Sequence, residues 1–414
     1  MAKNPGAGQK RALVIGGSMA GLFAALLLRK AGWQAEIFER IGSELAGRGA
    51  GIVTHQELLE IMQKCGVDSA AARVGVPVHG RRVFSRGGEL VAEMPLEQIV
   101  TSWGHLHGLL RRALPDTHFH HGRALVRVEE RGERVAAHFA DGSVEEGDLL
   151  VGADGIFSTV RAQFAPQVTP SYVGYIAWRG LVDEAALSDK TRADLCDHFP
   201  FSLPPGEQML GYPVAGLGEV MERGRRRFNF VWYRPAAAAG VLQDLLTDRD
   251  GVQHSLSIPP DRIRPEVVAR MRADAAATLA PQFAEVVERT PQPFIQVIQD
   301  LASPHMVLGR RTVILGDAAF VARPHVGMGV TKAAGDAEML VEALGRHGSD
   351  MDAALAEFEA ERVAFGAAVV RRAQQLGLYI EPRELTQEER AHAEYHRQPS
   401  AIMAETAVAT GIAA

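Results

Sequence analysis

The segment Gly16-Gly17-Ser18-Met19-Ala20-Gly21 constrains the fold more than any other part of the chain. It follows an apolar run, residues 12–15, which has the pattern of a strand buried on both faces. Residues 20–30 then favour a helix that ends before Gly32. The sequence therefore predicts a strand, a tight turn and a helix whose first free N–H groups can hold a pyrophosphate.

The glycines and the residues beyond this helix favour a dinucleotide site. Gly16 permits the tight turn, and Gly21 lets the helix approach the strand, while Ser18 stands where a second glycine is usual. Residues 34–38 have the pattern of a second strand that ends at Glu39, 23 residues after Gly16, where a carboxylate reaches a ribose hydroxyl. The alternative is an ordinary strand-helix-strand corner whose glycines serve only packing.

Two further segments have the form of a strand, a turn and a helix. Residues 149–161 predict a strand, a turn at Asp154, and a helix that opens near Ser158. Residues 312–337 predict a buried strand that delivers Asp317, then a glycine-rich loop that leads into another helix. An aspartate at a strand end can bond a polyol chain, and the helix N-terminus can stabilise negative charge on a reduced flavin ring.

These three motifs, in this order, resemble the group A flavoprotein monooxygenases, which have the fold of para-hydroxybenzoate hydroxylase. The chain is most similar to the 2,6-dihydroxypyridine 3-monooxygenase branch, on segments that begin at Val14, Gly49, Tyr172, Arg226 and Ala322. The resemblance implies an α/β fold with a Rossmann-like FAD-binding domain, an interleaved β-sheet substrate domain and a C-terminal helix. We expect the FAD-binding domain at 1–169 and 300–382, the substrate domain at 170–299 and a C-terminal tail at 383–414.

The resemblance also implies which residues contact a tightly but non-covalently bound FAD. The ADP half, the pyrophosphate, the ribityl chain and the isoalloxazine ring would be held by Gly16, Gly17, Ser18, Met19, Ala20, Gly21, Glu39, Arg40, Arg48, Leu125, Asp154, Arg161, Asp317, Pro324, Gly327, Met328, Gly329 and Val330. Asp154 is expected to serve the nicotinamide as well. The chain departs from the common family pattern at Ser18, Thr331 and Lys332, and Trp103 stands where many members have an arginine that contacts the flavin.

The implied reaction is hydroxylation of a small aromatic or N-heteroaromatic, hydroxypyridine-like substrate through a flavin C4a-hydroperoxide. NADH or NADPH would visit transiently, because the chain contains no second complete dinucleotide fingerprint. O2 is the other reactant. The hydroperoxide attacks a ring carbon that a hydroxyl group activates. Loss of the hydroxyl proton strengthens this attack, so a positioned base should help. Water must also be excluded from the site.

Candidate bases are His55, His325 and Tyr212, with His107 as a further histidine. His55 follows a glycine-rich turn, and His325 lies inside the expected flavin loop beside Pro324. The chain has 15 histidines, so a structural or solvated histidine is the competing interpretation at each position. Arg179 is either a substrate contact or a paired charge beside a strand.

Three alternatives share much of this pattern. A flavin-dependent halogenase would need a Trp-x-Trp pair, which the chain lacks. Dehydrogenation or epoxidation by the same cofactor is a second alternative. The third is a non-catalytic flavin-binding protein, in which a nicotinamide would fail to bleach the flavin.

Composition excludes several other classes. A net charge of −6 gives no reason to expect nucleic acid or an anionic membrane as a partner. Two distant cysteines, Cys65 and Cys196, predict neither a disulfide framework nor a metal site and favour the cytoplasm. Glycines interrupt the apolar run 12–28, which argues against a signal peptide. Residues 351–376 predict a long amphipathic helix, and the polar stretch after it is compatible with a homodimer contact.

Overall fold

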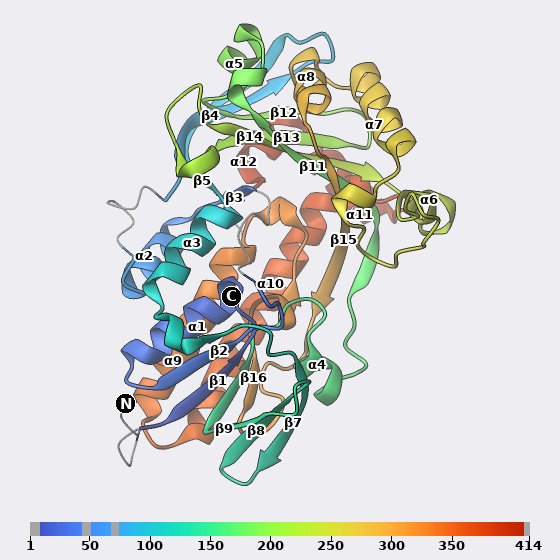
Figure 1. The fold of residues 1–414 in the computed structure, drawn as a ribbon. Coiled ribbons are helices and arrows are strands. Elements are labelled where there is room, and N and C mark those ends of the chain that lie inside the picture. The colour runs from blue at the N-terminus through green and yellow to red at the C-terminus, as the bar shows by residue number, and fades with distance from the viewer. Residues whose placement is uncertain (1–8, 44–50, 68–73, 410–414) are drawn as a thin grey trace.

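The computed structural model describes residues 9–43, 51–67 and 74–409, which form two units that lie one above the other in Figure 1. The lower unit is built on a parallel sheet with the strand order β16-β10-β1-β2-β6. Its strands are β1 (Arg11–Ile15), β2 (Gln34–Phe38), β6 (Phe119–His120), β10 (Leu149–Gly152) and β16 (Thr312–Ile314). These strands are rich in Val, Leu and Ile because both faces of the sheet are covered.

Helices and a small antiparallel sheet cover the two faces of the parallel sheet. Helix α1 packs on α9, and α9 packs on α10, while the sheet β7-β8-β9 lies on the opposite side (Figure 1). The elements of this unit are α1 (Met19–Lys30), α2 (Gln56–Lys64), α3 (Trp103–Ala113), β7 (Leu125–Arg131), β8 (Arg134–Phe139), β9 (Val144–Gly147), α4 (Thr159–Phe164), α9 (Gly329–His347) and α10 (Met351–Gly377). One apolar cluster joins the parallel sheet to these helices.

The upper unit is a mixed sheet with the strand order β17-β15-β11-β14-β13-β12-β4-β5-β3. Its strands are β3 (Gly51–Val53), β4 (Val76–Phe84), β5 (Leu90–Ser102), β11 (Ser171–Asp183), β12 (Phe199–Ser202), β13 (Gln208–Val214), β14 (Arg227–Pro235), β15 (Phe294–Ala302) and β17 (Phe320–Val321). The predicted α/β fold class is confirmed. Strands β3, β4 and β5 precede the 170–299 segment in the chain, yet they pair into this sheet.

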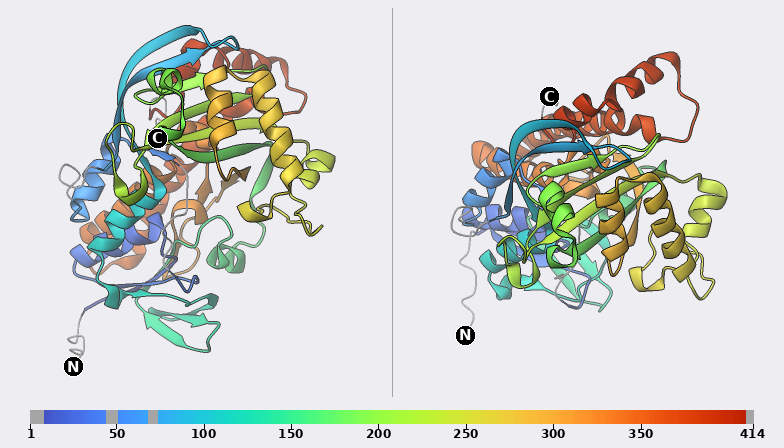
Figure 2. Two further views of the ribbon diagram at one scale, coloured as in Figure 1. Left: turned by 45° about the horizontal axis from the view of Figure 1, so that its top comes forward. Right: turned by 90° about the horizontal axis from the view of Figure 1, so that it is seen from above.

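The two faces of the upper sheet have different characters. Helices α5 (Asp189–Leu195), α6 (Gln243–Leu245), α7 (Pro265–Thr278) and α8 (Pro281–Arg289) lie on the outer face, as Figures 1 and 2 show. Trp178 and Trp232 pack on this outer face, in the apolar cluster with α7 and α8. The inner face looks toward the lower unit and packs against the C-terminal part of the chain.

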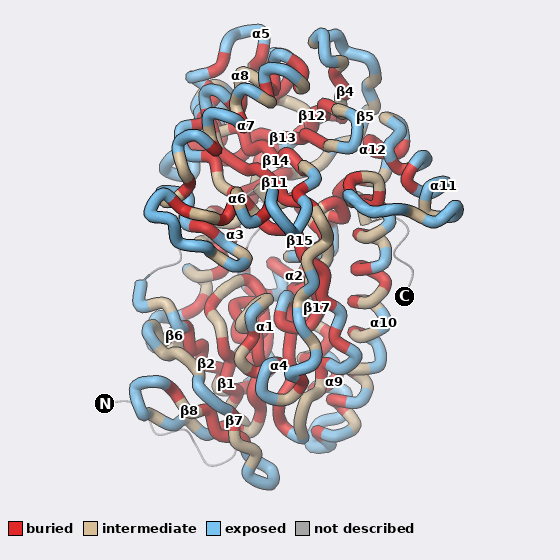
Figure 3. The backbone as a smooth tube through the Cα atoms, turned by 90° about the vertical axis from the view of Figure 1, so that its right-hand side faces the viewer, coloured by how far each residue is buried: buried red, intermediate tan, exposed pale blue. Residues whose placement is uncertain are grey.

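The C-terminal part connects both units. Helix α10 runs along the lower unit up to the second sheet with a stripe of buried residues (Figure 3), which confirms the helix predicted at 351–376. Helices α11 (Gln387–His396) and α12 (Pro399–Glu405) follow. Ile402, Met403 and Ala407 pack in the apolar cluster on the inner face of the upper sheet. The segment 402–407 therefore belongs to the wall between the units.

Two features are absent from residues 9–43, 51–67 and 74–409. None of their helices is both long enough and apolar enough to cross a bilayer. Within the same ranges, no group of His, Cys, Asp and Glu side chains is arranged to hold a metal ion.

Candidate active site

The turn between β1 and α1 has the close backbone contacts that require glycine. Gly16 has a φ of +103°, and a Cβ atom there would lie 2.4 Å from the Ala153 carbonyl oxygen on the neighbouring segment. A Cβ atom at Gly21 would lie 1.9 Å from the Gly16 carbonyl oxygen. Both positions therefore exclude a side chain, and the helix starts directly against the sheet.

Glu39 is held next to this turn by two backbone groups. The Gly17 N–H donates to Glu39 Oε2 at 2.7 Å, and the Ile41 N–H donates to Oε1 at 2.8 Å. Ser18 precedes α1, and its side chain makes no capping hydrogen bond to the helix. Its hydroxyl is therefore available to a ligand at the helix N-terminus, where N–H groups attract phosphate.

A cavity of about 330 Å³ runs from the end of β1 across the ends of β2 and β10. Among the sequence-predicted FAD contacts, it is lined by Gly16, Gly17, Ser18, Glu39, Arg40, Leu125 and Asp154, and Trp103 also lines it. Met19 and Ala20 are buried in the first turn of α1, where their backbone borders the same region. Residues from three strand ends thus meet at one elongated hollow, as expected at the switch point of a parallel sheet. Arg48 lies outside the described residues.

Asp154 has one oxygen in use and one without a partner. Its Oδ2 accepts from the N–H groups of Thr159 and Val160, at 2.7 and 3.2 Å, at the start of α4. Within the described residues, the buried Oδ1 has no hydrogen-bond partner. Burial raises the pKa of this carboxyl. An unpartnered buried oxygen that faces a cavity is the pattern expected where a ligand donor completes the bonding.

Arg161 lies behind Asp154 rather than at the cavity surface. Its guanidinium donates to the carbonyl oxygens of Val168, Ala318 and Ile156, and the residue is 4% exposed. These bonds tie α4 to the segment that follows β16. Through them Arg161 holds the loop after β10 against the turn that follows β16.

Asp317 lies in the short turn that follows β16. Its side chain is exposed. Nearby protein atoms nevertheless desolvate the carboxyl group and raise its pKa. None of its hydrogen-bonding capacity is used by a described residue. The neighbouring Gly316 packs against Ala20 of α1, since a Cβ atom there would lie 2.9 Å from the Ala20 Cβ. Asp317 is therefore brought to the α1 side of the site.

The loop from Pro324 to Val330 leads into α9 and leaves its N-terminus open. Gly327 is left-handed with a φ of +67°, and α9 begins at Gly329. A Cβ atom at Gly329 would meet no described atom within 4 Å. Pro324 and Val330 are half-buried and Met328 is buried. The free N–H groups of a 19-residue helix thus face open space beside the loop.

These features fit an extended dinucleotide with a polyol linker. Glycines line the narrow turn, Asp154 and Asp317 have oxygens that no described residue uses, and the N-termini of α1 and α9 are open. Each is a group that a phosphate, a ribityl chain or a flavin edge would satisfy. The Gly16 turn, Glu39 and Asp154 therefore have the character and the position that the ADP half of FAD would need.

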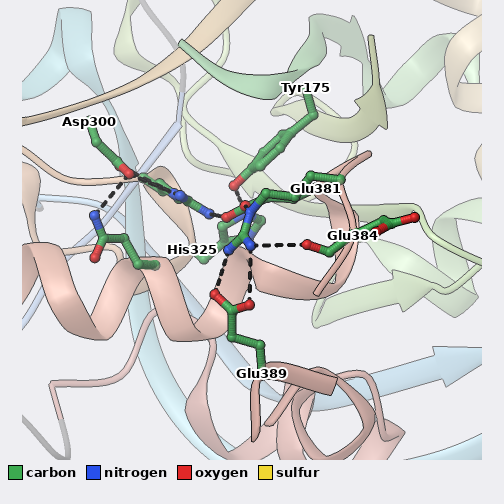
Figure 4. Close-up of polar contacts among 9 residues, drawn as sticks. Tyr175, Asp300, His325, Glu381, Glu384 and Glu389 are labelled. Carbon is green, nitrogen blue, oxygen red and sulfur yellow. Dashed lines mark hydrogen bonds and ion pairs between the residues drawn. The ribbon is translucent and has the colours of Figure 1, made fainter. Parts of the chain in front are cut away.

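His325 belongs to the loop 324–330, which we call the flavin loop. Its ring lies beside Tyr175 of the upper sheet, as the close-up in Figure 4 shows. Tyr175 Oη lies 2.9 Å from His325 Nε2, and Gln208 Oε1 lies 3.0 Å from Nδ1. Because a glutamine Oε1 only accepts, Nδ1 carries the proton and Nε2 accepts from the tyrosine. Burial lowers the pKa of His325 to about 3, so the ring is neutral. Both nitrogens are in use, and substrate would reach the ring only through these partners.

A buried ion network fixes the same loop from the other side. Arg323 donates to Asp300 at 2.9 Å and pairs with Glu381, which lies after α10 (Figure 4). Gln374 of α10 also donates to Asp300, at 3.1 Å. The loop is thus tied to β15 and to the end of α10, so that the position of His325 is set by both units.

His55 has a free ring nitrogen. Its Nδ1 lies 3.0 Å from Thr331 Oγ1 in the first turn of α9, and among the described residues its buried Nε2 has no partner. Burial lowers the pKa of the ring, so the neutral form that accepts a proton prevails near neutral pH. Thr331, one of the departures from the family pattern, therefore holds a candidate base.

Lys332 and Tyr212 occupy different places in the site. Lys332 pairs with Asp336 at 3.4 Å, both side chains being 1% exposed, and Asp336 also bonds Arg362. Lys332 thus serves α9 packing. Tyr212 lies on the inner face of the upper sheet, with its ring against Phe199, and burial raises its hydroxyl pKa to about 12. Tyr212 is therefore a neutral donor near neutral pH rather than a base.

Sequence reasoning missed two polar residues of this inner face, Gln208 and Asn229. Gln208 holds His325, and Asn229 Oδ1 accepts from the Gly51 N–H at 3.0 Å. Both alternate in phase with Tyr212 along β13 and its partner β14. That alternation was the available signal, since a polar residue in phase with buried ones points toward a ligand or a partner.

Comparison with known proteins gives two family matches. The family described as FAD binding domain matches residues 9–232, and the one described as FAD binding domain-like matches residues 172–300. A 2,6-dihydroxypyridine 3-monooxygenase of Paenarthrobacter nicotinovorans is 30% identical over 88% of this chain and 90% of that protein. A 6-hydroxynicotinate 3-monooxygenase of Pseudomonas fluorescens is 27% identical over 87% of this chain and 89% of that protein.

Solved structures agree with these matches. The 2,6-dihydroxypyridine-3-hydroxylase from Arthrobacter nicotinovorans superposes with a TM-score of 0.84 at 28% identity, covering 92% of this chain and 96% of that chain. Klebsiella pneumoniae HpxO complexed with FAD and uric acid has a TM-score of 0.75 at 22% identity, covering 96% and 98%. Because the identity to HpxO is only 22%, that similarity shows the fold alone.

Proposed function

Because this chain belongs to the class A flavin monooxygenases and uses FAD, we propose that it hydroxylates a small aromatic or N-heteroaromatic ring. The reductant in this proposal is NADH or NADPH, and O2 supplies the oxygen atom. The observation that carries the proposal is the cavity at the ends of β1, β2 and β10, where the Gly16 turn, Glu39 and Asp154 meet and where Asp154 Oδ1 has no partner among the described residues.

In this proposal the cavity residues hold FAD along its length. Glu39 binds a ribose hydroxyl, and the α1 N-terminus with Ser18 binds the pyrophosphate. The free Oδ1 of Asp154 accepts a hydrogen bond from the central part of the cofactor. Asp317 binds the ribityl chain, and the loop 324–330 lies against the ring. Arg40 and Leu125 line the wall, Met19 and Ala20 border it, and Arg161 supports Asp154 from behind.

When bound, FAD supplies two-electron transfer from a nicotinamide and the activation of O2. The protein contributes orientation, charge and dryness. The α9 N-terminus stabilises negative charge at the ring edge. The upper sheet covers the reaction from water, and its inner face is buried.

His55 is the base that we propose for the substrate hydroxyl. Its Nε2 has no partner among the described residues, and its pKa is lowered, so it can accept a proton near neutral pH. Tyr212 donates a hydrogen bond to the same substrate in this scheme. His325, with both ring nitrogens bonded, orients Tyr175 and the loop rather than meeting substrate.

The substrate class rests on the relatives. Proteins named for 2,6-dihydroxypyridine and for 6-hydroxynicotinate match most of this chain. We therefore propose a hydroxylated pyridine or a similar flat ring as the substrate.

The test is a screen of hydroxypyridines, hydroxynicotinates and phenols with the purified holoenzyme. A substrate should accelerate the loss of flavin absorbance on addition of NADH or NADPH, and its product should gain one oxygen atom by mass spectrometry. A product that has lost two hydrogens and gained no oxygen would show that the enzyme is a dehydrogenase and not a hydroxylase. A flavin that no ring and no nicotinamide bleaches would make the protein a non-catalytic flavin binder and overturn the proposal.

We also propose that the enzyme acts in the cytoplasm as a homodimer, as the family resemblance implies. Cys65 and Cys196 are both free and buried, which suits a reducing compartment. Burial raises the pKa of both thiols, so neither is reactive. Light scattering that gives the 44.7 kDa mass of one chain would exclude the dimer.

A further inference from the structure

The inner face of the upper sheet carries a row of polar residues that a closed apolar core would not contain. On β11, Tyr175 and Arg179 point to this face, while Trp178 between them points to the outer face. On β14 the alternation places Asn229 and Tyr233 on the same inner face. Tyr175 touches His325 of the flavin loop, so the face looks toward that loop.

Arg179 is a buried cation on this face. It is 9% exposed and lies opposite Val231 of β14, between the positions of Asn229 and Tyr233 on the same strand. Its Nη1 donates to Gln296 Oε1 at 2.7 Å. Its Nε is buried, and no described residue accepts from it. Within the described ranges, Arg179 forms no ion pair with a carboxylate.

Other buried arginines of the chain are better satisfied. Carboxylates within 3.0 Å or less pair with Arg226, Arg311, Arg323 and Arg362. Arg161 instead donates to three carbonyl oxygens, and Arg81 donates to Met403 O and Gln98 Oε1. Arg179 alone among these seven has a single neutral side-chain acceptor within the described part of the chain. A buried charge in that condition is costly unless a ligand completes it.

Neighbouring groups on the same face are also incomplete. The buried Nδ2 of Asn229 has no partner among the described residues. The hydroxyls of Tyr212 and Tyr233 form no hydrogen bond within those ranges either. Tyr212 lies opposite Asn229 in the β13–β14 register. A cation, an amide donor and two hydroxyl donors thus gather where a ligand rich in acceptor oxygens would satisfy all of them.

We propose that the Arg179 guanidinium anchors the substrate and binds an anionic group of a flat ring, either a carboxylate or an ionised ring oxygen. This inference rests on the proposed function and narrows its substrate class to anions. Asn229, Tyr212 and Tyr233 donate to the remaining ring oxygens. His55 and Arg179 act in sequence. His55 removes the proton of the substrate hydroxyl, and the Arg179 guanidinium then stabilises the negative charge left on the substrate.

The experiment compares charged probes with neutral analogues built on the same ring, using holoenzyme without a nicotinamide. The first pair is 6-hydroxynicotinate and 6-hydroxynicotinamide, which tests a carboxylate. The second pair is 2,6-dihydroxypyridine and its dimethoxy derivative, which tests an ionised ring oxygen. Dissociation constants come from the perturbation of the flavin absorbance and from calorimetry. We expect at least one charged probe to bind about 10- to 100-fold more tightly than its neutral partner.

Arg179→Gln should remove this preference, while Arg179→Lys should keep part of it. The matched control is Arg234→Gln on the same strand pair, since Arg234 pairs with Glu207 and Asp274 and lies away from the inner face. Equal affinity of wild-type enzyme for both members of each pair would overturn the proposal. So would Arg179→Gln weakening the charged and neutral probes by the same factor.

The wild-type comparison needs no variant, so equal affinities overturn the proposal even if Arg179→Gln fails to fold. In that case Arg179→Lys tests the residue itself. The wild-type comparison also separates this inference from the proposed function. An enzyme that hydroxylates neutral rings and shows no preference for anions would keep the function and lose the role of Arg179. An enzyme that prefers anions without hydroxylating any of them would keep the role of Arg179 and lose the proposed function.

Discussion

At the scale of single residues, Asp317 is the sharpest test of the cofactor site. Its carboxylate has no hydrogen-bond partner among the described residues, and desolvation raises its pKa, so the hydroxyls of a bound polyol would supply the missing donors. Asp317→Ala should therefore purify with little FAD, and its Kd for FAD should rise by about 10- to 100-fold, as for loss of a charged hydrogen bond. The measurement is the flavin-to-protein absorbance ratio, followed by titration with FAD.

Asp261→Ala is the control for this variant, because Asp261 is exposed in the upper unit. It should retain a full complement of flavin. A fully yellow Asp317→Ala protein with unchanged affinity would remove Asp317 from the ribityl site.

The residues near Asp317 also indicate how far sequence reasoning reaches. Gly16, Gly21 and Glu39 were predictable because their partners are set by a short strand, turn and helix, and the structure shows the close contacts that require those glycines. The contacts of His325 were not predictable. They join residues 150 and 117 positions apart, and only the packing of the two units brings those residues together.

At the scale of elements, the segment 399–409 closes the site beside the flavin loop. The Ala407 N–H donates to the His325 carbonyl at 2.7 Å, and Gln98 Nε2 donates to the Ala407 carbonyl at 3.0 Å. Arg81, which is fully buried, donates to the Met403 carbonyl at 2.7 Å. A Cβ atom at Gly327 would lie 2.8 Å from the Ala407 Cβ, so the segment touches the loop itself.

Removal of residues 399–414 should therefore admit water to the reaction. The expected result is uncoupling, in which NADH oxidation produces more hydrogen peroxide per product molecule than in the intact enzyme. Peroxide and product are measured in the same reaction. Arg390→Ala, an exposed position on α11, is the control. Unchanged coupling in the shortened enzyme would assign the segment to stability alone.

The elements also divide into those that local pattern predicts and those that it does not. Strands β1 and β2 were expected from short apolar runs, and α10 was expected from its helical spacing. The pairing of β4 with β12 was not, because these strands are more than 100 residues apart and no local feature specifies that register. The direction of Trp178 likewise follows from which face the helices cover.

At the scale of the whole molecule, FAD should act as a structural link. Its proposed contacts come from β1, β2, β10 and the segment after β16, which are all embedded in one apolar cluster. A ligand that binds only the folded chain stabilises it by about 2.7 kcal/mol at 100 times its Kd. The melting temperature should therefore rise by several degrees with FAD and continue to rise with the logarithm of free FAD.

Riboflavin distinguishes this linkage from a general effect of the ring. It lacks the ADP half, so the cavity between the Gly16 turn and Glu39 would remain unfilled. We expect riboflavin at the same concentration to raise the melting temperature less than FAD, because the phosphate and ribose contacts contribute most of the affinity. Scanning calorimetry of apoprotein with each compound makes the comparison. Equal shifts for both compounds would mean that the glycine-rich turn holds no part of the cofactor.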